Sequence, residues 1–285
     1  MALIDFILNL AGVLIWLNWR SIRFDLLIKT TPATLVGTLR RAEPRRPKGW
    51  HLLAGLAALL VLRALLYRLI GTEADWTPRF NLFFVAPPFK SHLFLPMMLF
   101  SLLSFARILI ICYFWLLILA VINRRNAEPD PLQKMLRLHL GAVARWPWPL
   151  QVFLPLVLVA GLWLALHPLL VHLEIAGRAR SNVHLAGQGV LIGTALYFSL
   201  QYLLPPLLLL HLVASYVYLG GSPVWDFVGA TARNLLAPLH WLPLRIARFD
   251  FAPLAGAILI LFLLHWLPNL ILGRMAGNNV TLWPQ

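Results

Sequence analysis

Six apolar stretches, each long enough to cross a lipid bilayer, set the main constraint on how this chain can fold. A transmembrane helix needs about 20 mainly apolar residues, because the hydrocarbon layer is ~30 Å thick and each residue rises ~1.5 Å. Only 12% of the residues are charged, against roughly a quarter in soluble proteins. We therefore predict an all-α membrane protein with six transmembrane helices in a single membrane domain. The helices are expected at roughly residues 2–19, 50–70, 93–122, 150–172, 190–219 and 251–272.

The connections between these stretches have at most about 30 residues, which leaves no room for a separate soluble domain. Function is therefore expected in the membrane body or in its short loops. The third and fifth stretches exceed the bilayer thickness, so they are expected to tilt, to kink at Pro96 or Pro205-Pro206, or to project beyond the lipid. The first stretch has no basic residues before it and is predicted to be a retained helix rather than a signal peptide.

Lysine and arginine gather in alternate connections. Of the 24 in the chain, residues 20–49 hold eight, residues 123–149 hold five and residues 220–250 hold three. Basic loops are retained in the cytoplasm, so this asymmetry predicts that these three connections are cytoplasmic and that both termini lie on the other side. Nucleic-acid binding is the other usual meaning of a net charge of +14. The loop asymmetry already accounts for the charge, so no nucleic-acid partner is predicted.

Each basic connection contains a helix-capping residue followed by proline, at Thr31-Pro32, Asp130-Pro131 and Ser222-Pro223, with intervals of 99 and 92 residues. A capping oxygen satisfies free N–H groups at a helix start, and proline suits the first helical position. The recurrence predicts three two-helix repeats, each with a short cytoplasmic helix. Because each repeat has an even number of spans, the three are expected to be parallel. They cover residues 1–70, 93–172 and 190–272.

The short helices are predicted to be amphipathic, because apolar side chains follow each proline at helical spacing with basic residues between them. Leu132, Met135 and Leu136, for example, alternate with Lys134 and Arg137. This pattern is typical of a helix in the membrane interface with its basic side toward anionic headgroups. A helix packed beneath its own bundle is the alternative. Predicted contacts with anionic lipid headgroups in the first connection are Arg40, Arg41, Arg45, Arg46 and Lys48.

The third repeat carries the most specific motif. Pro243-Leu244-Arg245 is followed by Arg248, and Asp250-Phe251-Ala252-Pro253 then enters an apolar helix. Over roughly residues 190–272 the chain resembles the YggT (YlmG-related) integral membrane family, in which a Pro-Leu-Arg-Arg-like turn precedes an Ile-Asp-Phe-Ser-Pro-like helix start. Arg248-Phe249 stands where the family has Gly-Gly, and the first two repeats lack the Asp-Phe-Ser-Pro-like element.

The resemblance implies a bacterial inner-membrane or plastid-type protein. In a bacterium, the loop charges would place both termini in the periplasm. The family is associated with osmotic or ion homeostasis, cell division or the maturation of membrane complexes, and it implies no catalytic residues. A membrane-protein partner or a homo-oligomer is expected.

Two roles are open for Asp250. A carboxylate at a helix entrance can cap free N–H groups and meet the positive end of the helix dipole, with Pro253 in the first turn. Alternatively, Asp250 is a cation-contacting carboxylate beside Arg245 and Arg248.

Arg107 is the candidate intramembrane functional site, because it lies in the middle of the third apolar stretch. A guanidinium there costs about 2.5–3.5 kcal/mol and should face the protein interior or a wet cavity, unless it snorkels to a headgroup. Arg63 and Arg68 lie nearer a helix end and are expected to snorkel. Partners considered for Arg107 are Ser101, Ser104, Gln201, carbonyls freed by Pro205-Pro206, an anion and a lipid phosphate.

Neither a cofactor nor an enzyme activity is predicted. The single Cys112 allows no intrachain disulfide or cysteine metal cluster. Of the histidines in the apolar stretches, only His167 and His265 are roughly matched in depth, so haem ligation is not expected. The chain has no zinc-protease motif, nucleophile elbow or glycine-rich phosphate loop.

Two classes of function remain. The first is a scaffold, assembly factor or accessory subunit for membrane complexes. The second is an ion or small-solute channel or carrier linked to osmotic homeostasis, with Arg107 in its pathway. A closed, hydrated cavity at Arg107 would favour transport, whereas dry, tightly packed helices would count against it.

Overall fold

The computed structural model describes residues 2–28, 49–73, 76–125, 131–218, 220–239, 241, 245–246 and 249–277. Within these residues, six helical segments are long and apolar enough to cross a membrane, so the predicted multi-pass class is confirmed. The segments are Leu3–Ser21, Gly49–Glu73, Phe94–Ile122, Trp148–His172, Asn182–Tyr216 and Ala252–Ile271.

The chain divides into two compact units, which are described separately. The first comprises Met1–Phe80 and Pro87–Ile110, and the second comprises Asn81–Ala86 and Ile111–Gln285. Helix α3 (Phe94–Ile122) contributes its first part to one unit and its remainder to the other.

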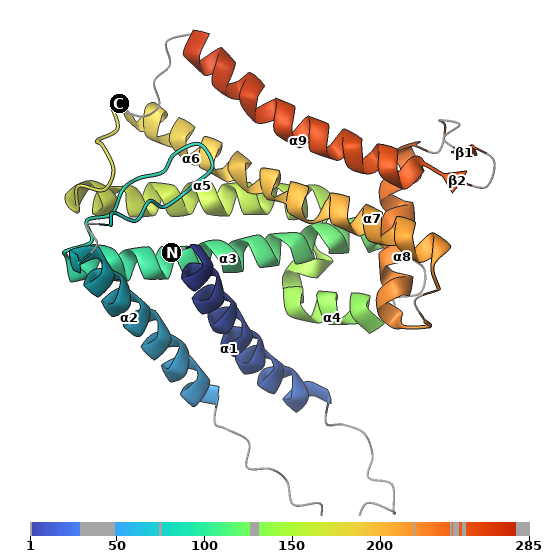
Figure 1. Ribbon diagram of the computed structural model, residues 1–285, viewed down its shortest axis with the longest axis horizontal. Helices are drawn as coiled ribbons and strands as arrows, with labels where there is room; N and C mark the ends of the chain where they lie inside the picture. The colour runs from blue at the N-terminus through green and yellow to red at the C-terminus, as the bar shows by residue number, and fades with distance from the viewer. Residues whose placement is uncertain are drawn as a thin grey trace, which may run out of the picture. The chain divides into compact units, whose positions relative to one another are not determined.

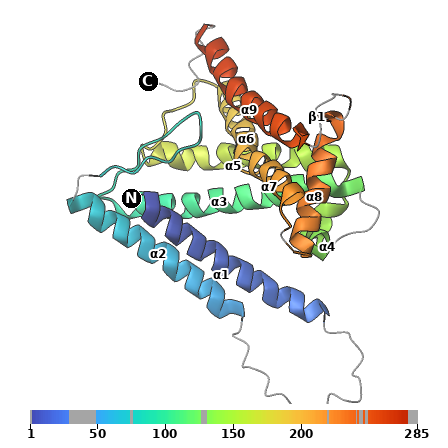
Figure 2. The same cartoon turned by 45° about the vertical axis from the view of Figure 1, so that its right-hand side comes forward.

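In the first unit, α1 (Ala2–Ile28) and α2 (Gly49–Glu73) lie side by side and run antiparallel (Figures 1 and 2). Leu56 and Leu60 of α2 form a small buried core with Phe105 of α3. Gly12 of α1 allows a close approach, because a Cβ at this position would lie 2.9 Å from the Phe105 ring. The three helices therefore pack closely at this point.

In the second unit, α5 (Trp148–His172) packs most extensively against α6 (Asn182–Phe198), as Figure 1 shows. Glycines permit this contact. A Cβ at Gly193 would lie 2.8 Å from the carbonyl oxygen of Leu156, and one at Gly189 would lie 3.1 Å from that of Ala160. This contact joins the last helix of the second predicted repeat to the first helix of the third.

The fifth span is interrupted rather than continuous. Helix α6 ends at Phe198, a 3-10 turn η3 (Ser199–Tyr202) follows, and α7 (Leu204–Tyr216) begins just before Pro205-Pro206. Proline lacks an N–H and clashes with the preceding turn, so a helix restarts there more easily than it continues. Pro96, the other kink position considered, lies in the first turn of α3, where its missing N–H breaks no helical hydrogen bond.

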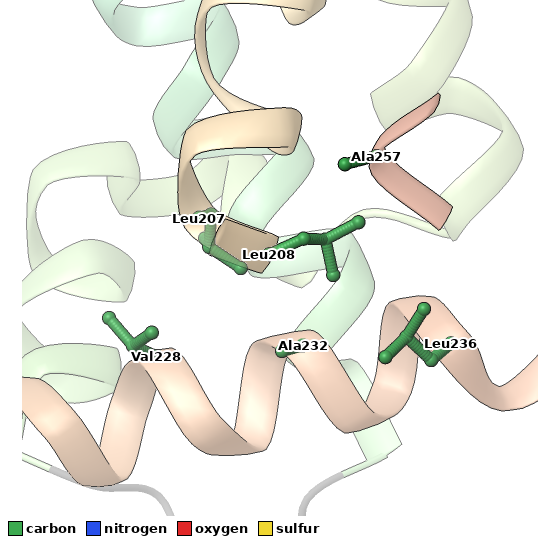
Figure 3. Packing of buried hydrophobic residues seen from close by; sticks show 6 residues of the cluster. All are labelled: Leu207, Leu208, Val228, Ala232, Leu236 and Ala257. Carbon is green, nitrogen blue, oxygen red and sulfur yellow. The ribbon is translucent and has the colours of Figure 1, made fainter. Parts of the chain in front are cut away.

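Helix α8 (Pro223–Leu236) packs across α7 and α9 (Ala252–Gly277). In Figure 3, side chains along one face of α8 point toward α7 and α9. Leu208 and Ala232 are completely buried where α7 and α8 meet. The apolar face of α8 is thus covered by its own unit. The cluster comprises Leu207, Leu208, Val228, Ala232, Leu236 and Ala257.

Asn123 fastens both short helices of the second unit to the end of α3. It begins the 3-10 turn η1 (Asn123–Arg125) and is completely buried. Its side-chain amide donates to the Thr231 hydroxyl of α8 at 2.7 Å, and its backbone carbonyl accepts from the Gln133 amide of α4 (Pro131–Leu140) at 2.5 Å. The side-chain amide of Asn234 donates to Oδ1 of Asn123 at 3.1 Å. The short helices are therefore fixed by buried polar contacts.

Candidate functional site

A buried ion pair joins the first two helices. The guanidinium of Arg63 on α2 contacts Oδ1 of Asp5 on α1. Arg63 is completely buried, whereas the side chain of Asp5 keeps 28% of its exposure. A buried guanidinium costs several kcal/mol unless both its charge and its N–H groups are satisfied.

Every nitrogen of this guanidinium has an acceptor within the first unit. Nε donates to the Tyr67 hydroxyl at 3.2 Å, and Nη1 donates to Oδ1 of Asn9 at 2.7 Å. Nη2 donates to the Ser104 hydroxyl at 2.7 Å as well as to Asp5. The three nitrogens of Arg63 thus bind groups from α1, α2 and α3.

The carboxylate of Asp5 is held by further donors. The Tyr67 hydroxyl donates to Oδ1 of Asp5 at 2.8 Å. The side-chain amide of Asn9 donates to Oδ2 of Asp5 at 3.3 Å and to the Ser104 hydroxyl oxygen at 3.2 Å. Asp5, Asn9, Arg63, Tyr67 and Ser104 form one connected network, which we call the polar cluster.

Helical spacing explains how the sequence builds this cluster. Asp5 and Asn9 are four residues apart on α1, and Arg63 and Tyr67 are four apart on α2, so each pair lies on one helix face. Ser104 comes from α3. One turn earlier, the Ser101 hydroxyl donates to the carbonyl oxygen of Leu60 at 2.9 Å and ties α3 to α2.

Aromatic rings surround the cluster. The Tyr67 ring meets Trp76 and Phe100 edge to face, with ring centroids 5.6 and 5.7 Å apart. Phe100 also contacts Phe89, with centroids at 5.4 Å. The charges of Arg63 and Asp5 therefore interact through low-dielectric surroundings, where an ion pair is stronger than in water.

Arg107 lies near this cluster on α3. Its Cζ lies 5.3 Å from the centroid of the Phe80 ring, within cation–π distance. It also interacts electrostatically with Asp5 and Arg63. Two arginines therefore act on one carboxylate, which gives these three residues a formal charge of +1.

Two of the partners expected for Arg107, Ser101 and Ser104, have other contacts in the structure. Ser104 accepts from Arg63, and Ser101 donates to Leu60. Gln201 and Pro205-Pro206 belong to the second compact unit. The contact with Phe80 was not foreseen from the sequence, because Phe80 lies in a connection rather than in an apolar stretch.

The expectation that Arg63 snorkels to the membrane surface is wrong. Arg63 is buried among protein groups because Asp5, Asn9 and Ser104 lie opposite it on α1 and α3. Asp5 lies near the beginning of the first apolar stretch, and its position in the sequence does not identify it as the partner of Arg63. The paired four-residue spacings on α1 and α2 were the available signal. Arg68, one turn beyond Ala64, is exposed.

The motif of the third predicted repeat forms a small structured entrance to α9. The strands β1 (Arg245–Ile246) and β2 (Phe249–Asp250) pair antiparallel, with Arg245 opposite Asp250 in the backbone register. Oδ1 of Asp250 accepts from the backbone N–H of Ala252 at 3.0 Å and so satisfies a free N–H group at the start of α9. Pro253 is buried in the first turn of α9.

The other cap positions differ in detail. Helix α4 begins at Pro131 and α8 begins at Pro223. Ser222 is the N-cap of α8, but its hydroxyl makes no capping hydrogen bond, and its carbonyl oxygen accepts from Trp225 at 3.0 Å instead. The hydroxyl cap expected there is therefore not formed. Thr31, Pro32, Asp130, Arg248, Arg40, Arg41, Arg45, Arg46 and Lys48 lie outside the described residues.

Within the residues that the structure describes, no group of three or more His, Cys, Asp or Glu side chains is placed to hold a metal ion. The polar cluster is a buried site of the first unit in which each group forms a hydrogen bond with another group of the cluster. Comparisons with family models, with curated proteins and with solved structures found no match to this chain.

Proposed function

We propose that this protein is a polytopic inner-membrane scaffold, acting as an assembly factor or accessory subunit for membrane complexes. The proposal includes a YggT-like family relationship, a bacterial inner membrane, periplasmic termini and cytoplasmic basic connections. Three parallel repeats with amphipathic short helices are part of the same proposal. A membrane-protein partner or a second copy of the chain would be held by the spanning helices, without enzymatic chemistry.

The scaffold proposal rests on the hydrogen bonds of Arg63, all of whose guanidinium nitrogens donate to protein groups. Each nitrogen of its guanidinium donates to a neighbouring side chain, and the pair with Asp5 joins α1 to α2. A transport site needs groups that exchange protein partners for solute or water. The polar cluster instead uses its buried charge to hold three helices together.

The surface of the spanning helices supports a role in holding other membrane components. On α9, Phe262 and Trp266 stack with ring centroids 6.3 Å apart, and both are exposed. On α5, Phe153 and Val157 are each 61% exposed. Such surfaces suit lipid chains or the helices of a partner protein.

A channel or carrier is the second candidate, and Arg107 is the observation that favours it. Arg107 and Arg63 both act on Asp5, so the first unit carries excess positive charge within spanning helices. Excess positive charge within the membrane suits a small anion. In this alternative, Arg107 would contact the transported ion. The flux of that ion across the membrane would then contribute to osmotic homeostasis.

Purification from native membranes in mild detergent separates the two candidates. A scaffold is expected to bring down one or more membrane proteins at fixed stoichiometry, identified by mass spectrometry. The Arg107→Ala variant should retain these partners. Isolation of the chain without any partner in two different mild detergents would contradict the scaffold proposal.

Reconstitution in liposomes tests the second candidate. Anion flux that is lost in Arg107→Ala and kept in Arg68→Ala would support a channel or carrier, because Arg68 is an exposed arginine on a neighbouring spanning helix. A scaffold predicts no flux above that of empty liposomes for the wild type. Equal flux in the wild type and both variants would exclude Arg107 from a pathway.

A further inference from the structure

A basic pocket opens in the second unit, where the end of α3 meets α4, the 3-10 turn η2 (Gly141–Arg145) and the start of α5. Its volume is about 640 Å³. The residues that line it include Arg124, Lys134, Arg137, Gly141, Arg145 and Gln151.

The charged side chains among the described lining residues all have the same sign. Arg124, Lys134, Arg137 and Arg145 are all exposed, and none of the described residues that line the pocket is acidic. Four cations around one cavity repel one another and attract an anion. Arginine in particular presents a planar fork of donors that matches phosphate oxygens.

The pocket has a fixed frame. Asn123, next to Arg124, anchors α4 through Gln133. Gln151, another lining residue, is buried and its amide donates to the carbonyl oxygen of Val143 at 2.9 Å, which ties η2 to α5. Gly141 has φ of +58°, a conformation that costs other residues more than glycine, and it lets the chain turn sharply from α4 into η2.

The surroundings of the pocket are those of a membrane interface. Trp146 and Trp148 follow the lining residue Arg145 in the chain and are 43% and 55% exposed. Indole rings favour the boundary between headgroups and hydrocarbon. Leu150, Phe153 and Val157 then continue along one face of α5 at helical spacing, all of them exposed. A cationic cavity is thus followed by an apolar stripe.

We propose that this pocket binds the phosphate-bearing headgroup of an anionic lipid, with the acyl chains along the exposed face of α5. Phosphate in solution shares the headgroup's chemistry, but the tryptophans that follow Arg145 and the apolar stripe favour the lipid. This site does not depend on the scaffold function, because it requires only that the ends of α3 and α5 lie at a membrane surface.

Native mass spectrometry of the full-length protein in detergent tests the proposal, with phosphatidylglycerol, phosphatidylcholine and inorganic phosphate as separate probes. The wild type is expected to bind phosphatidylglycerol at least about tenfold more tightly than phosphatidylcholine, since each cation near an anionic lipid surface contributes about fivefold. The triple variant Lys134→Gln, Arg137→Gln, Arg145→Gln should lose this preference.

A matched triple variant removes three exposed arginines elsewhere, at Arg79, Arg178 and Arg180. It should keep the preference for phosphatidylglycerol. An equal loss in both triple variants would overturn the pocket as the site, because it would show a general effect of surface charge. Displacement of the bound phosphatidylglycerol by millimolar inorganic phosphate would overturn the lipid as the occupant.

A second measurement does not rely on the stability of any variant. A photoactivatable phosphatidylglycerol, mixed with the wild-type protein in liposomes and irradiated, should label peptides within residues 131–158. Labelling concentrated elsewhere in the chain would overturn the proposal.

Discussion

Arg63 is completely buried, whereas its partner Asp5 keeps 28% side-chain exposure, so the two ends of this ion pair stand in unequal surroundings. The carboxylate is partly accessible from outside the protein, and the guanidinium is not. The two halves of the pair should therefore differ in what their removal costs.

Asp5→Leu should destabilise the protein by about 3–5 kcal/mol, because it leaves the buried guanidinium of Arg63 without its counter-charge. Arg63→Met should cost less, since Asp5 can be solvated in part. The double variant should be more stable than Asp5→Leu alone. Unfolding by SDS in mixed micelles measures all three. The control Arg68→Met, at an exposed arginine on the same helix, should change little. Strict additivity of the two single effects would contradict a coupled pair.

Gly71→Ala should destabilise the first unit by about 1–3 kcal/mol through overpacking. A Cβ at Gly71 would lie 2.3 Å from Cβ of Ser91 and 3.3 Å from the carbonyl oxygen of Trp76. Gly55→Ala is the matched control on the same helix, because no atom lies within 4 Å of a Cβ at that position. It should be neutral or stabilising by up to ~1 kcal/mol. Thermal unfolding in detergent compares them, and Ser91→Gly should recover part of the loss.

Gly193→Ala should weaken the packing of α5 on α6 by about 1–3 kcal/mol, because the new Cβ would approach the backbone oxygen of Leu156 to 2.8 Å. A backbone atom cannot move aside as a side chain can. Gly161→Ala on α5 meets open space and should be tolerated. The melting temperatures of the two variants give the comparison, and equal values would argue against the observed contact between α5 and α6.

Asp250→Ala should cost about 1 kcal/mol, since it removes the acceptor of the Ala252 N–H at the start of α9. Asp250→Asn keeps an oxygen and should cost less. Hydrogen exchange measured by mass spectrometry should show faster exchange in the first turn of α9 in the alanine variant alone. Unchanged exchange in that turn would rule out a capping role for Asp250.

The six spans could be predicted because apolar length is a property of each segment by itself. The interruption of the fifth span was also visible, since Pro205-Pro206 affects the helix that contains it. The prediction that Arg63 snorkels is wrong because its surroundings depend on the register of α2 against α1. Asp5 is 58 residues away in the chain, and no periodicity within α2 reveals it.

For Arg107, the sequence predicts the depth in the membrane but not the contacts with other segments. Its depth within the third apolar stretch identified it as unusual, because depth can be counted along one helix. The Phe80 ring that it contacts lies in a connection, and the carboxylate that acts on it belongs to another helix. Similarly, the charges of the basic pocket come from η1, α4 and η2, and only folding brings them around one cavity.

The ion pair between Asp5 and Arg63 also bears on biogenesis. Arg63 lies near the middle of α2. An arginine in the middle of a helix that enters lipid alone raises the free energy of insertion by about 2.5–3.5 kcal/mol. Asp5 precedes Arg63 in the chain, so its carboxylate is already synthesised when α2 leaves the ribosome. We therefore expect α1 and α2 to enter the lipid together as a helical hairpin, in which Asp5 and Arg63 are already paired.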